Sequence, residues 1–315
     1  MKKAPQAPED FIVPLNINGL EGRMLRVPST KKNGREILLL YGHHAILERW
    51  WGLVENLTDY GTVTMPDLPG FGGMESFYKI GRKPDIDAYA DYLAAFIKLR
   101  YKRGRITIYA VSYGFIVATR MLQRYPELAK KVDILVSVAG FMHKDDFKLL
   151  KSQRYMYIGL SRFFATRPVA TLIRYVALNK FVITTLTKLI PHSKSRHIEV
   201  DPERFDMAMN FEVTLWQAND VRTHMKTTCE FLRLDNCTRR IDLPVLHVSS
   251  QEDHYFNNIA VEQHMRQVFS DYTDFNSSSK AHVPSVIAGK KEMSVLLPAG
   301  LRKLLNSKTK SGTKV

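Results

Sequence analysis

The sequence RITIYAVSYG, Arg105–Gly114, decides how this chain folds. Arg105–Val111 is a mostly apolar run, which predicts a buried strand of a parallel sheet. Helical spacing follows from Phe115 to Arg124, so Ser112 lies between a predicted strand and a predicted helix. Small residues on either side, Ala110 and Gly114, allow a tight turn that lifts the serine hydroxyl above the sheet. A-x-S-x-G occurs often by chance, and its position at a strand end is what gives it weight.

The alternation of strand and helix extends to both sides of this stretch. Polar–apolar alternation in Phe11–Val27 around Asn18-Gly19 predicts a β-hairpin. Strand–helix–strand order requires right-handed crossovers, so we expect an α/β fold with a mostly parallel, twisted sheet flanked by helices. Further predicted strands are Glu36–Tyr41, Gly61–Met65 and Val132–Ala139, and further predicted helices are Trp50–Leu57 and Asp85–Tyr101.

The alternation stops between Phe141 and Arg222, where helical periodicity prevails. Pro168, Pro191 and Pro202 divide this segment into roughly four predicted helices. We therefore expect an α/β core formed by residues 1–140 and 223–315, with a helical cap inserted at 141–222 and a basic C-terminal tail. The elements expected after the cap are helix Thr223–Leu234, strand Val245–Ser249 after Pro244, helix Asn258–Phe269, strand Tyr272–Asn276 and helix Lys290–Leu305.

The composition is that of an ordinary globular protein, with 45% apolar and 24% charged residues. The net charge of +15 comes from scattered Lys and Arg residues, and no nucleic-acid-binding motif accompanies them, so no nucleic-acid partner is expected. Contact with an anionic membrane surface is the alternative that the charge and the apolar cap leave open. No pattern specifies an oligomeric state.

The two cysteines, Cys229 and Cys237, match no common zinc spacing and are too few for a disulfide framework. The N-terminal segment lacks an apolar signal core, and no charge-free apolar run approaches the ~20 residues of a membrane span. These features predict a cytoplasmic protein with reduced cysteines.

Two more residues follow predicted strands at the edge where functional side chains of parallel sheets gather. Asp253 comes shortly after Val245–Ser249, with Glu252 as a competitor and helix capping as an alternative role. His282 follows the last predicted strand. A lone histidine is more often structural than catalytic, but the chain order Ser112, Asp253, His282 is the one that a strand–serine–helix turn of this kind requires.

Together these features resemble the α/β-hydrolase superfamily, in particular its members with a helical cap inserted after the sixth core strand. The resemblance covers Glu36–Gly140 and Leu243–Leu305. It rests on Leu40-Tyr41-Gly42-His43, on the loop Asp67–Gly72 (DLPGFG) and on the serine turn. These motifs are specific for the fold, and none identifies a substrate.

The resemblance implies an esterase-like serine hydrolase. His282 would take the proton of the Ser112 hydroxyl, and Asp253 would orient the imidazole. The backbone N–H groups of His43 and Tyr113 would form the oxyanion hole. No cofactor is implied, because this chemistry needs none. A serine at the turn argues against haloalkane dehalogenase or epoxide hydrolase activity, for which this superfamily uses aspartate.

Three positions depart from the common family pattern. Tyr41 replaces the usual histidine, and Ala110 and Ala281 stand where glycine is common. Tyr41 and Ala281 would change surrounding hydrogen bonds without removing a proposed catalytic group.

Substrate contacts are expected from His44, Phe141, Met142 and Trp216. Phe141 and Met142 follow the predicted strand whose end faces the serine. A metal site at the His43-His44 pair is disfavoured because the sequence places no third ligand, so no metal is expected. Cap residues that could line an apolar pocket, with packing of cap on core as the alternative for each, are Met156, Phe163, Phe164, Phe211 and Trp216.

We therefore expect cleavage of a small-molecule carboxylic ester or related carbonyl compound through an acyl-enzyme. The alternatives within the fold are carbon–carbon bond hydrolysis, lactone hydrolysis and peptide hydrolysis. An alternative from a different class is a catalytically silent binding protein.

Overall fold

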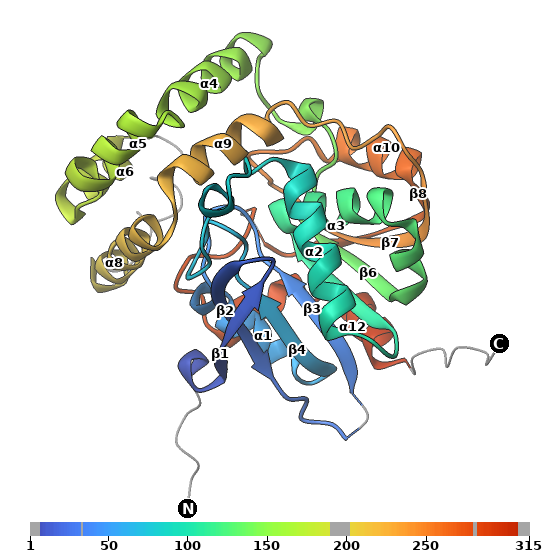
Figure 1. Cartoon of the computed structure of the whole chain (residues 1–315). Helices are drawn as coiled ribbons and strands as arrows, with labels where there is room; N and C mark the ends of the chain where they lie inside the picture. Colours follow the sequence, from blue (N-terminus) through green and yellow to red (C-terminus); the bar gives the residue numbers. More distant parts are fainter. Residues whose placement is uncertain (1–6, 33, 190–201, 280–281, 308–315) are drawn as a thin grey trace, which may run out of the picture.

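The computed structural model describes residues 7–32, 34–189, 202–279 and 282–307. Within these residues eight strands form one sheet in the order β1-β2-β4-β3-β5-β6-β7-β8 (Figure 1). The pairs β1–β2 and β2–β4 are antiparallel, and all later neighbours are parallel. The strands are β1 (Ile12–Ile17), β2 (Leu20–Val27), β3 (Arg35–Leu40), β4 (Gly61–Pro66), β5 (Ile106–Val111), β6 (Val132–Val138), β7 (Ile241–Ser250) and β8 (Phe269–Ser277).

Helices cover both faces of the sheet. In Figure 1, α2 and α3 lie in front of the strands and pack against each other, whereas α1 lies behind and packs against α11. The helices of the core are α1 (Trp51–Leu57), α2 (Ile86–Arg100), α3 (Tyr113–Arg124), α10 (Asn258–Val268), α11 (Lys290–Met293) and α12 (Ala299–Asn306). Short helical turns are η1 (Pro8–Phe11), η2 (Leu47–Trp50), η3 (Phe77–Ile80), η4 (Pro126–Lys131), η5 (Lys144–Asp146) and η7 (Ser294–Leu296).

The main hydrophobic core lies on both faces of β5. All six residues of this strand are buried, as the mostly apolar run predicts. At the edge of the sheet, Asn18 and Gly19 have φ angles of 53° and 78°. Two successive positive φ angles close a hairpin with the twist that its strands need, so the predicted Asn-Gly hairpin is confirmed.

The inserted helices form an arm on one side of the sheet (Figure 1). Their bounds are α4 (Lys151–Phe164), α5 (Arg167–Leu172), the π-helical turn η6 (Ile173–Ala177), α6 (Lys180–Leu189), α8 (Pro202–Ala218) and α9 (Val221–Phe231). α9 packs against α4 and α5, and the backbone N–H of Asp220 donates to the carbonyl of Gly70 at 2.9 Å. The expected boundary after Arg222 falls inside α9. The three-part division of the chain stays a prediction.

Two predicted elements differ from the structure. β7 starts at Ile241 and includes Pro244, whereas the sequence placed this proline before the strand. β7 pairs with β6 only from Val245 onward, so the missing N–H of Pro244 removes no hydrogen bond on that side. The single last helix expected at Lys290–Leu305 is three short helices, and Pro298 precedes the last of them.

Both cysteines are free, as the sequence predicts. Among the described residues no helix is long and apolar enough to span a bilayer.

Candidate active site

Ser112 occupies the turn between β5 and α3, and its backbone is strained. Its φ of 47° and ψ of −112° lie outside the regions that L-residues normally adopt. Its backbone N–H donates to the carbonyl of Val138 at 2.8 Å, which ties the turn to the end of β6. A Cβ on Gly114 would lie 2.7 Å from the carbonyl oxygen of Tyr41, so glycine is needed for α3 to approach this closely. The tight strand-to-helix turn expected from the sequence is present.

The side chains of Ser112, His282 and Asp253 form one hydrogen-bonded chain. His282 Nε2 lies 3.0 Å from Ser112 Oγ, and His282 Nδ1 lies 2.7 Å from Asp253 Oδ2. A ring proton on Nδ1 donates to the carboxylate and leaves Nε2 to accept the serine O–H. The structure thus brings together the three residues that the sequence singled out.

The Asp253 carboxylate is held from both of its oxygens. It is only 2% exposed, and its Oδ1 accepts the backbone N–H groups of Tyr255 at 2.8 Å and Phe256 at 3.2 Å. These donors fix the carboxylate plane, so Oδ2 is directed at the imidazole. Glu252, the competitor one position earlier, is exposed to solvent.

Aromatic rings enclose His282. Tyr255 and Phe256 lie 5.3 and 5.2 Å from the imidazole, measured between ring centroids. Phe141 stacks on Phe256 at 4.6 Å with an angle of 21° between the ring planes. One ring, that of Phe256, therefore lies between Phe141 and the His282 imidazole. Met142 is completely buried in the main core, which is the environment of a packing residue, and its contact with substrate stays a prediction.

The loop after β3 approaches the serine from another side. A Cβ built on Gly42, the residue before His43, would lie 3.4 Å from the Cβ of Ser112, so this loop passes next to the serine. The Tyr113 N–H, at the first position of α3, has no partner within its helix. Neither N–H is hydrogen-bonded to another described residue. Both are available as donors to a bound oxygen.

The loop that follows β4 is organised around the buried carboxylate of Asp67. It accepts hydrogen bonds from the Tyr41 hydroxyl at 2.9 Å, from Arg23 Nε at 2.8 Å and from the Gly73 N–H at 2.9 Å. Burial raises the pKa of Asp67 to about 6, although these three donors oppose the rise. The Tyr41 hydroxyl also accepts the N–H of Leu68 at 2.7 Å. Tyr41, the departure at the family's usual histidine, therefore fixes this loop without touching the Ser112 chain.

Three histidines and Trp216 meet between the core and the inserted helices. The His43 ring lies 4.3 Å from the His224 ring, and Trp216 lies 4.3 Å from His44 and 4.9 Å from His224. His43 Nε2 is 2.8 Å from Thr227 Oγ1 on α9. We call His43, His44, His224 and Trp216 the imidazole cluster.

The environment of two rings of the imidazole cluster, His43 and His224, favours their neutral forms. Burial, together with the neighbouring His44, lowers the pKa of His43 to about 3. Burial lowers the pKa of His224 well below its ordinary value, and His43 and His44 add to the effect. Two neutral imidazoles thus lie beside the proposed oxyanion donor, and neither adds a positive charge there.

Some cap residues expected to line a pocket point elsewhere. Met156 and Phe163 on α4 are 52% and 58% exposed, so the expectation that they line an enclosed pocket is wrong. Phe211 on α8 packs against a small cluster that includes Ile46 and Val286, which is cap-on-core packing. Helical spacing predicts an apolar helix here but does not indicate which of its faces points inward.

Sequence reasoning missed His224 and Phe256. His224 lies mid-helix among polar residues and carries no motif. Phe256 follows Asp253 by three residues, and an aromatic residue so close to the proposed acid was the available signal.

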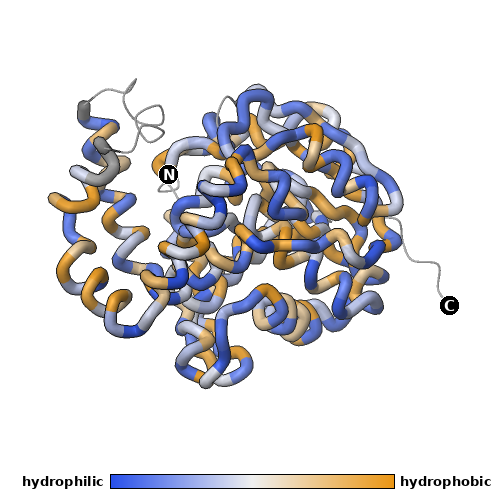
Figure 2. The backbone as a smooth tube through the Cα atoms, turned by 90° about the horizontal axis from the view of Figure 1, so that it is seen from above, coloured by the Kyte–Doolittle hydropathy of each residue, from blue (hydrophilic) through white to orange (hydrophobic). Residues whose placement is uncertain are grey.

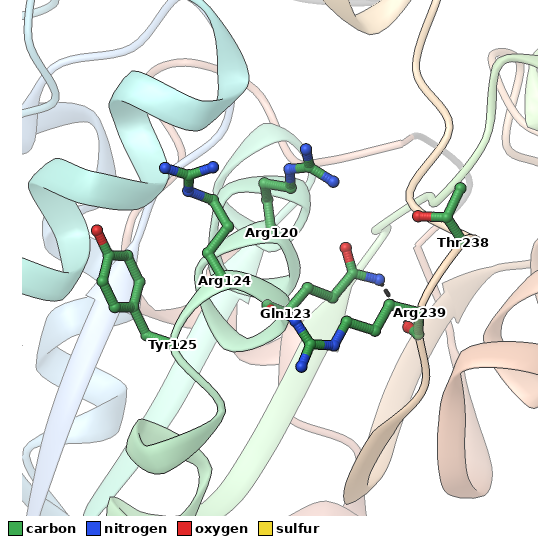
Figure 3. Close-up of a pocket in the computed structure, with 6 residues that line it drawn as sticks. All are labelled: Arg120, Gln123, Arg124, Tyr125, Thr238 and Arg239. Carbon is green, nitrogen blue, oxygen red and sulfur yellow. Dashed lines mark hydrogen bonds between the residues drawn. The ribbon is translucent and has the colours of Figure 1, made fainter.

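A separate cavity of about 420 Å³ lies at the other end of α3 (Figure 3). The lining residues from α3 and its end, Arg120 to Tyr125, lie 8 to 13 residues beyond Ser112, so the cavity is roughly 12–19 Å from the serine along the helix axis. Carboxylates of Asp87 and Asp91 bind two of its arginines, Arg120 and Arg124. It is therefore distinct from the serine site. The cavity is lined by Arg120, Gln123, Arg124, Tyr125, Thr238 and Arg239.

Among the described side chains no group of three or more His, Cys, Asp or Glu is arranged to hold a metal ion.

The chain is similar in structure to several solved enzymes. An esterase from Exiguobacterium antarcticum has a TM-score of 0.66 at 13% identity, with 92% of this chain and 97% of the esterase covered. A thermophilic esterase from Thermogutta terrifontis has a TM-score of 0.60 at 14% identity, with 94% and 97% covered. A mutant epoxide hydrolase from Bacillus megaterium has a TM-score of 0.63 at 14% identity, with 93% and 99% covered. At such identities these similarities show the fold alone.

No curated protein sequence matches this chain significantly. A family model described as the alpha/beta hydrolase fold, however, matches residues 37–285, which is most of the chain. The sheet order, the serine turn and this match lead to one conclusion: the chain belongs to the α/β-hydrolase fold family.

Proposed function

We propose that this protein is a serine hydrolase that cleaves a carboxylic ester or a related carbonyl compound through an acyl-enzyme. The observation that carries the proposal is the hydrogen-bonded chain from Ser112 Oγ through His282 to Asp253. A serine hydroxyl alone is a poor nucleophile at neutral pH, and an adjacent imidazole activates it.

In the first half of the reaction, Ser112 Oγ attacks the substrate carbonyl carbon while His282 Nε2 takes the serine proton. The imidazolium that forms is stabilised by the Asp253 carboxylate across the 2.7 Å hydrogen bond. His282 then donates this proton to the leaving alcohol. In the second half, water attacks the acyl carbon while His282 takes a proton from the water; the bond to Ser112 Oγ then breaks, His282 returns the proton to Ser112, and the carboxylic acid leaves.

The negative charge on the tetrahedral oxygen needs preorganised donors. The N–H groups of His43 and Tyr113 are suited to this role, since neither is hydrogen-bonded to another described residue. Removing one such donor typically costs about 2.7–4 kcal/mol of transition-state stabilisation. The His43 and His224 rings, whose pKa values are lowered by burial, add no positive charge beside the proposed donors, which suits an uncharged substrate better than an anionic one.

Labelling with a fluorophosphonate probe tests this proposal directly. We expect the native chain to be labelled and Ser112→Ala to be silent. His282→Ala and Asp253→Asn should slow labelling and p-nitrophenyl ester hydrolysis by about 10⁴-fold.

The chain offers matched controls. His264 is hydrogen-bonded to Asp146 in a second Asp–His pair that contains no serine, and Glu252 is the exposed neighbour of Asp253. His264→Ala and Glu252→Gln should label like the native chain. Labelling that survives Ser112→Ala would exclude Ser112 as the nucleophile, and a folded native chain that never labels would favour a silent binding protein. A chain that labels but refuses esters would direct the search to diketones, lactones and peptides.

A further inference from the structure

Helix α4 has apolar side chains on its exposed side. On the side where α4 packs against α9, the buried residues are Arg154, Ile158 and Ser161, and only Ile158 of these is apolar. Met156, Leu160 and Phe163 recur at helical spacing on the opposite side and are 44–58% exposed. An ordinary surface helix has one apolar stripe facing the core, so the outer stripe of α4 needs another explanation.

Exposed apolar side chains continue along the inserted arm. Leu172, Tyr175 and Phe181, on α5, η6 and α6, are 62–82% exposed. In Figure 2, stretches of the tube coloured for hydrophobic residues lie along the arm on the left of the molecule, to which α4, α5 and α6 belong. We call the set Met156, Leu160, Phe163, Leu172, Tyr175 and Phe181 the cap outer surface. Exposed apolar residues gathered on one segment mark interaction sites more often than scattered ones do.

The charge of the same segment has one sign. Residues 147–189 contain eight Lys or Arg residues and no Asp or Glu. Arg162, Arg167 and Arg174 are exposed and alternate in sequence with the apolar residues of the cap outer surface. The whole chain, by contrast, has 31 acidic residues among its 315. The surface therefore combines apolar side chains with an excess of positive charge, although one of the eight cations, Arg154, is paired with Asp145.

This combination selects the occupant. A second copy of the chain would bring two sets of cations together, which like-charge repulsion opposes. An anionic lipid bilayer offers phosphates to the Lys and Arg side chains and an apolar interior to Leu, Phe and Met, while Tyr suits the interface between them. We propose that the cap outer surface docks the protein on an anionic lipid bilayer. Docking is independent of the proposed hydrolase chemistry.

The test measures co-sedimentation of the Ser112→Ala chain, which cannot hydrolyse lipid by the proposed mechanism, with two kinds of vesicle. One is phosphatidylcholine alone, and the other contains 30% phosphatidylserine. We expect binding to the anionic vesicles at low salt, at least tenfold weaker binding to the neutral ones, and a loss in high salt. Failure of this binding leaves fluorophosphonate labelling of the native chain unaffected, so the two proposals fail separately.

Two pairs of variants locate the contact. The first variant, Arg162→Gln/Arg167→Gln/Arg174→Gln, should reduce vesicle partitioning at least tenfold. Its control, Lys102→Gln/Arg103→Gln/Lys130→Gln, removes the same charge from exposed core positions and should change partitioning less than twofold. Leu160→Ser/Leu172→Ser should also reduce it at least tenfold, in contrast to Ile259→Ser/Leu304→Ser on the core. All four variants change exposed side chains, so folding is checked by circular dichroism.

Three outcomes would overturn the proposal. One is absence of binding to anionic vesicles at low salt. Another is an equal loss of binding in the Arg162/Arg167/Arg174 and Lys102/Arg103/Lys130 triple variants, which would mean that net charge alone acts. The third is full binding by Leu160→Ser/Leu172→Ser together with equally tight binding of the native chain to soluble poly-glutamate, which would indicate an acidic protein partner.

Discussion

At the scale of single residues, the serine turn depends on the absence of a side chain at Gly114 as well as on the presence of Ser112. Gly114 has no side chain, and both the Tyr41 carbonyl oxygen and Leu40 would lie within 2.8 Å of a Cβ placed there. Backbone cannot move away as a flexible side chain can. Ala110, in contrast, is fully buried in β5 with its methyl group accommodated.

We predict that Gly114→Ala lowers the free energy of unfolding by about 1–3 kcal/mol and abolishes fluorophosphonate labelling, because overpacking must displace α3 or the turn. Thermal unfolding and labelling measure the two effects. Gly159→Ala is the control: nothing lies within 4 Å of a Cβ at this helical position, so the alanine should stabilise by up to about 1 kcal/mol. Equal behaviour of the two variants would contradict the prediction.

The hydroxyl of Tyr41 provides a second prediction. Tyr41→Phe removes the donor to Asp67 Oδ1 and the acceptor of the Leu68 N–H, both inside the molecule. We expect a loss of about 1–3 kcal/mol, because buried polar groups are left without partners. Denaturant unfolding measures it, with Tyr175→Phe, at an 82% exposed site, as the unaffected control. A fully stable Tyr41→Phe would mean that water replaces the hydroxyl.

At the scale of elements, the start of α9 joins the inserted helices to the core. The Asp220 side chain caps this helix by accepting the Thr223 N–H at 2.7 Å, while Asn219 Oδ1 accepts the Gly72 N–H at 2.9 Å. Gly70, with a φ of +83°, lies under Thr223, where a Cβ would approach within 2.6 Å. The junction is thus fixed to the loop that follows β4.

We expect Asp220→Ala to lower stability by about 0.5–2 kcal/mol through loss of the cap. Asp220→Asn keeps an acceptor oxygen and should lie close to the native chain. The comparison is made by thermal unfolding, and an equal loss in both variants would show that charge rather than capping matters here.

The elements that the sequence predicted well are those with one dominant local cause. The apolar run of β5 and the Asn18-Gly19 turn leave few alternatives, and both were found where expected. The effects of Pro244 and Pro298 were predicted wrongly, in opposite directions: Pro244 was placed outside a strand that includes it, and Pro298 was placed inside a helix that it interrupts. A proline is tolerated in β7 because one side of the strand is still unpaired there, whereas Pro298 divides a helix that its apolar spacing suggested was continuous. Both outcomes depend on tertiary neighbours, which local patterns do not contain.

The same distinction applies to the candidate site. Ser112, Asp253 and His282 could be found because chain order and strand ends constrain them. In the imidazole cluster, His44 and Trp216 are expected from the sequence as substrate contacts, whereas His224 is not, because it reaches His43 and His44 only through the packing of α9 on the core.

At the scale of the whole molecule, buried neutral histidines make stability depend on pH. The pKa of His43 is lowered to about 3 and that of His247 to about 4, both mainly by burial, and the pKa of His224 is lowered in the same direction. Each of these groups binds its proton less tightly in the folded chain than in the unfolded one. The stability that they contribute is complete above the ordinary histidine pKa of 6.5 and is lost as the pH falls toward 3–4.

We predict that the free energy of unfolding decreases below pH 6.5 with a slope of up to about 1.4 kcal/mol per pH unit for each such histidine. Urea unfolding between pH 4.5 and 7.5 measures the slope. His224→Gln should flatten it, because glutamine does not titrate. A stability that stays constant down to pH 4.5 would contradict the assignment of neutral rings.

One last consequence concerns the order in which the chain is made. β6 pairs with β7, yet Val138 and Val248 at the matching ends of the ladder are separated by the whole insertion. Val248, the partner of Val138, leaves the ribosome 110 residues after it (248 minus 138), which takes about 5–20 s at common synthesis rates. Throughout that interval the nascent sheet ends in an open, apolar edge at β6. The helical segment between β6 and β7 thus lengthens the time during which the unfinished protein needs protection from aggregation, and a chaperone that binds exposed strands would act at this stage of translation.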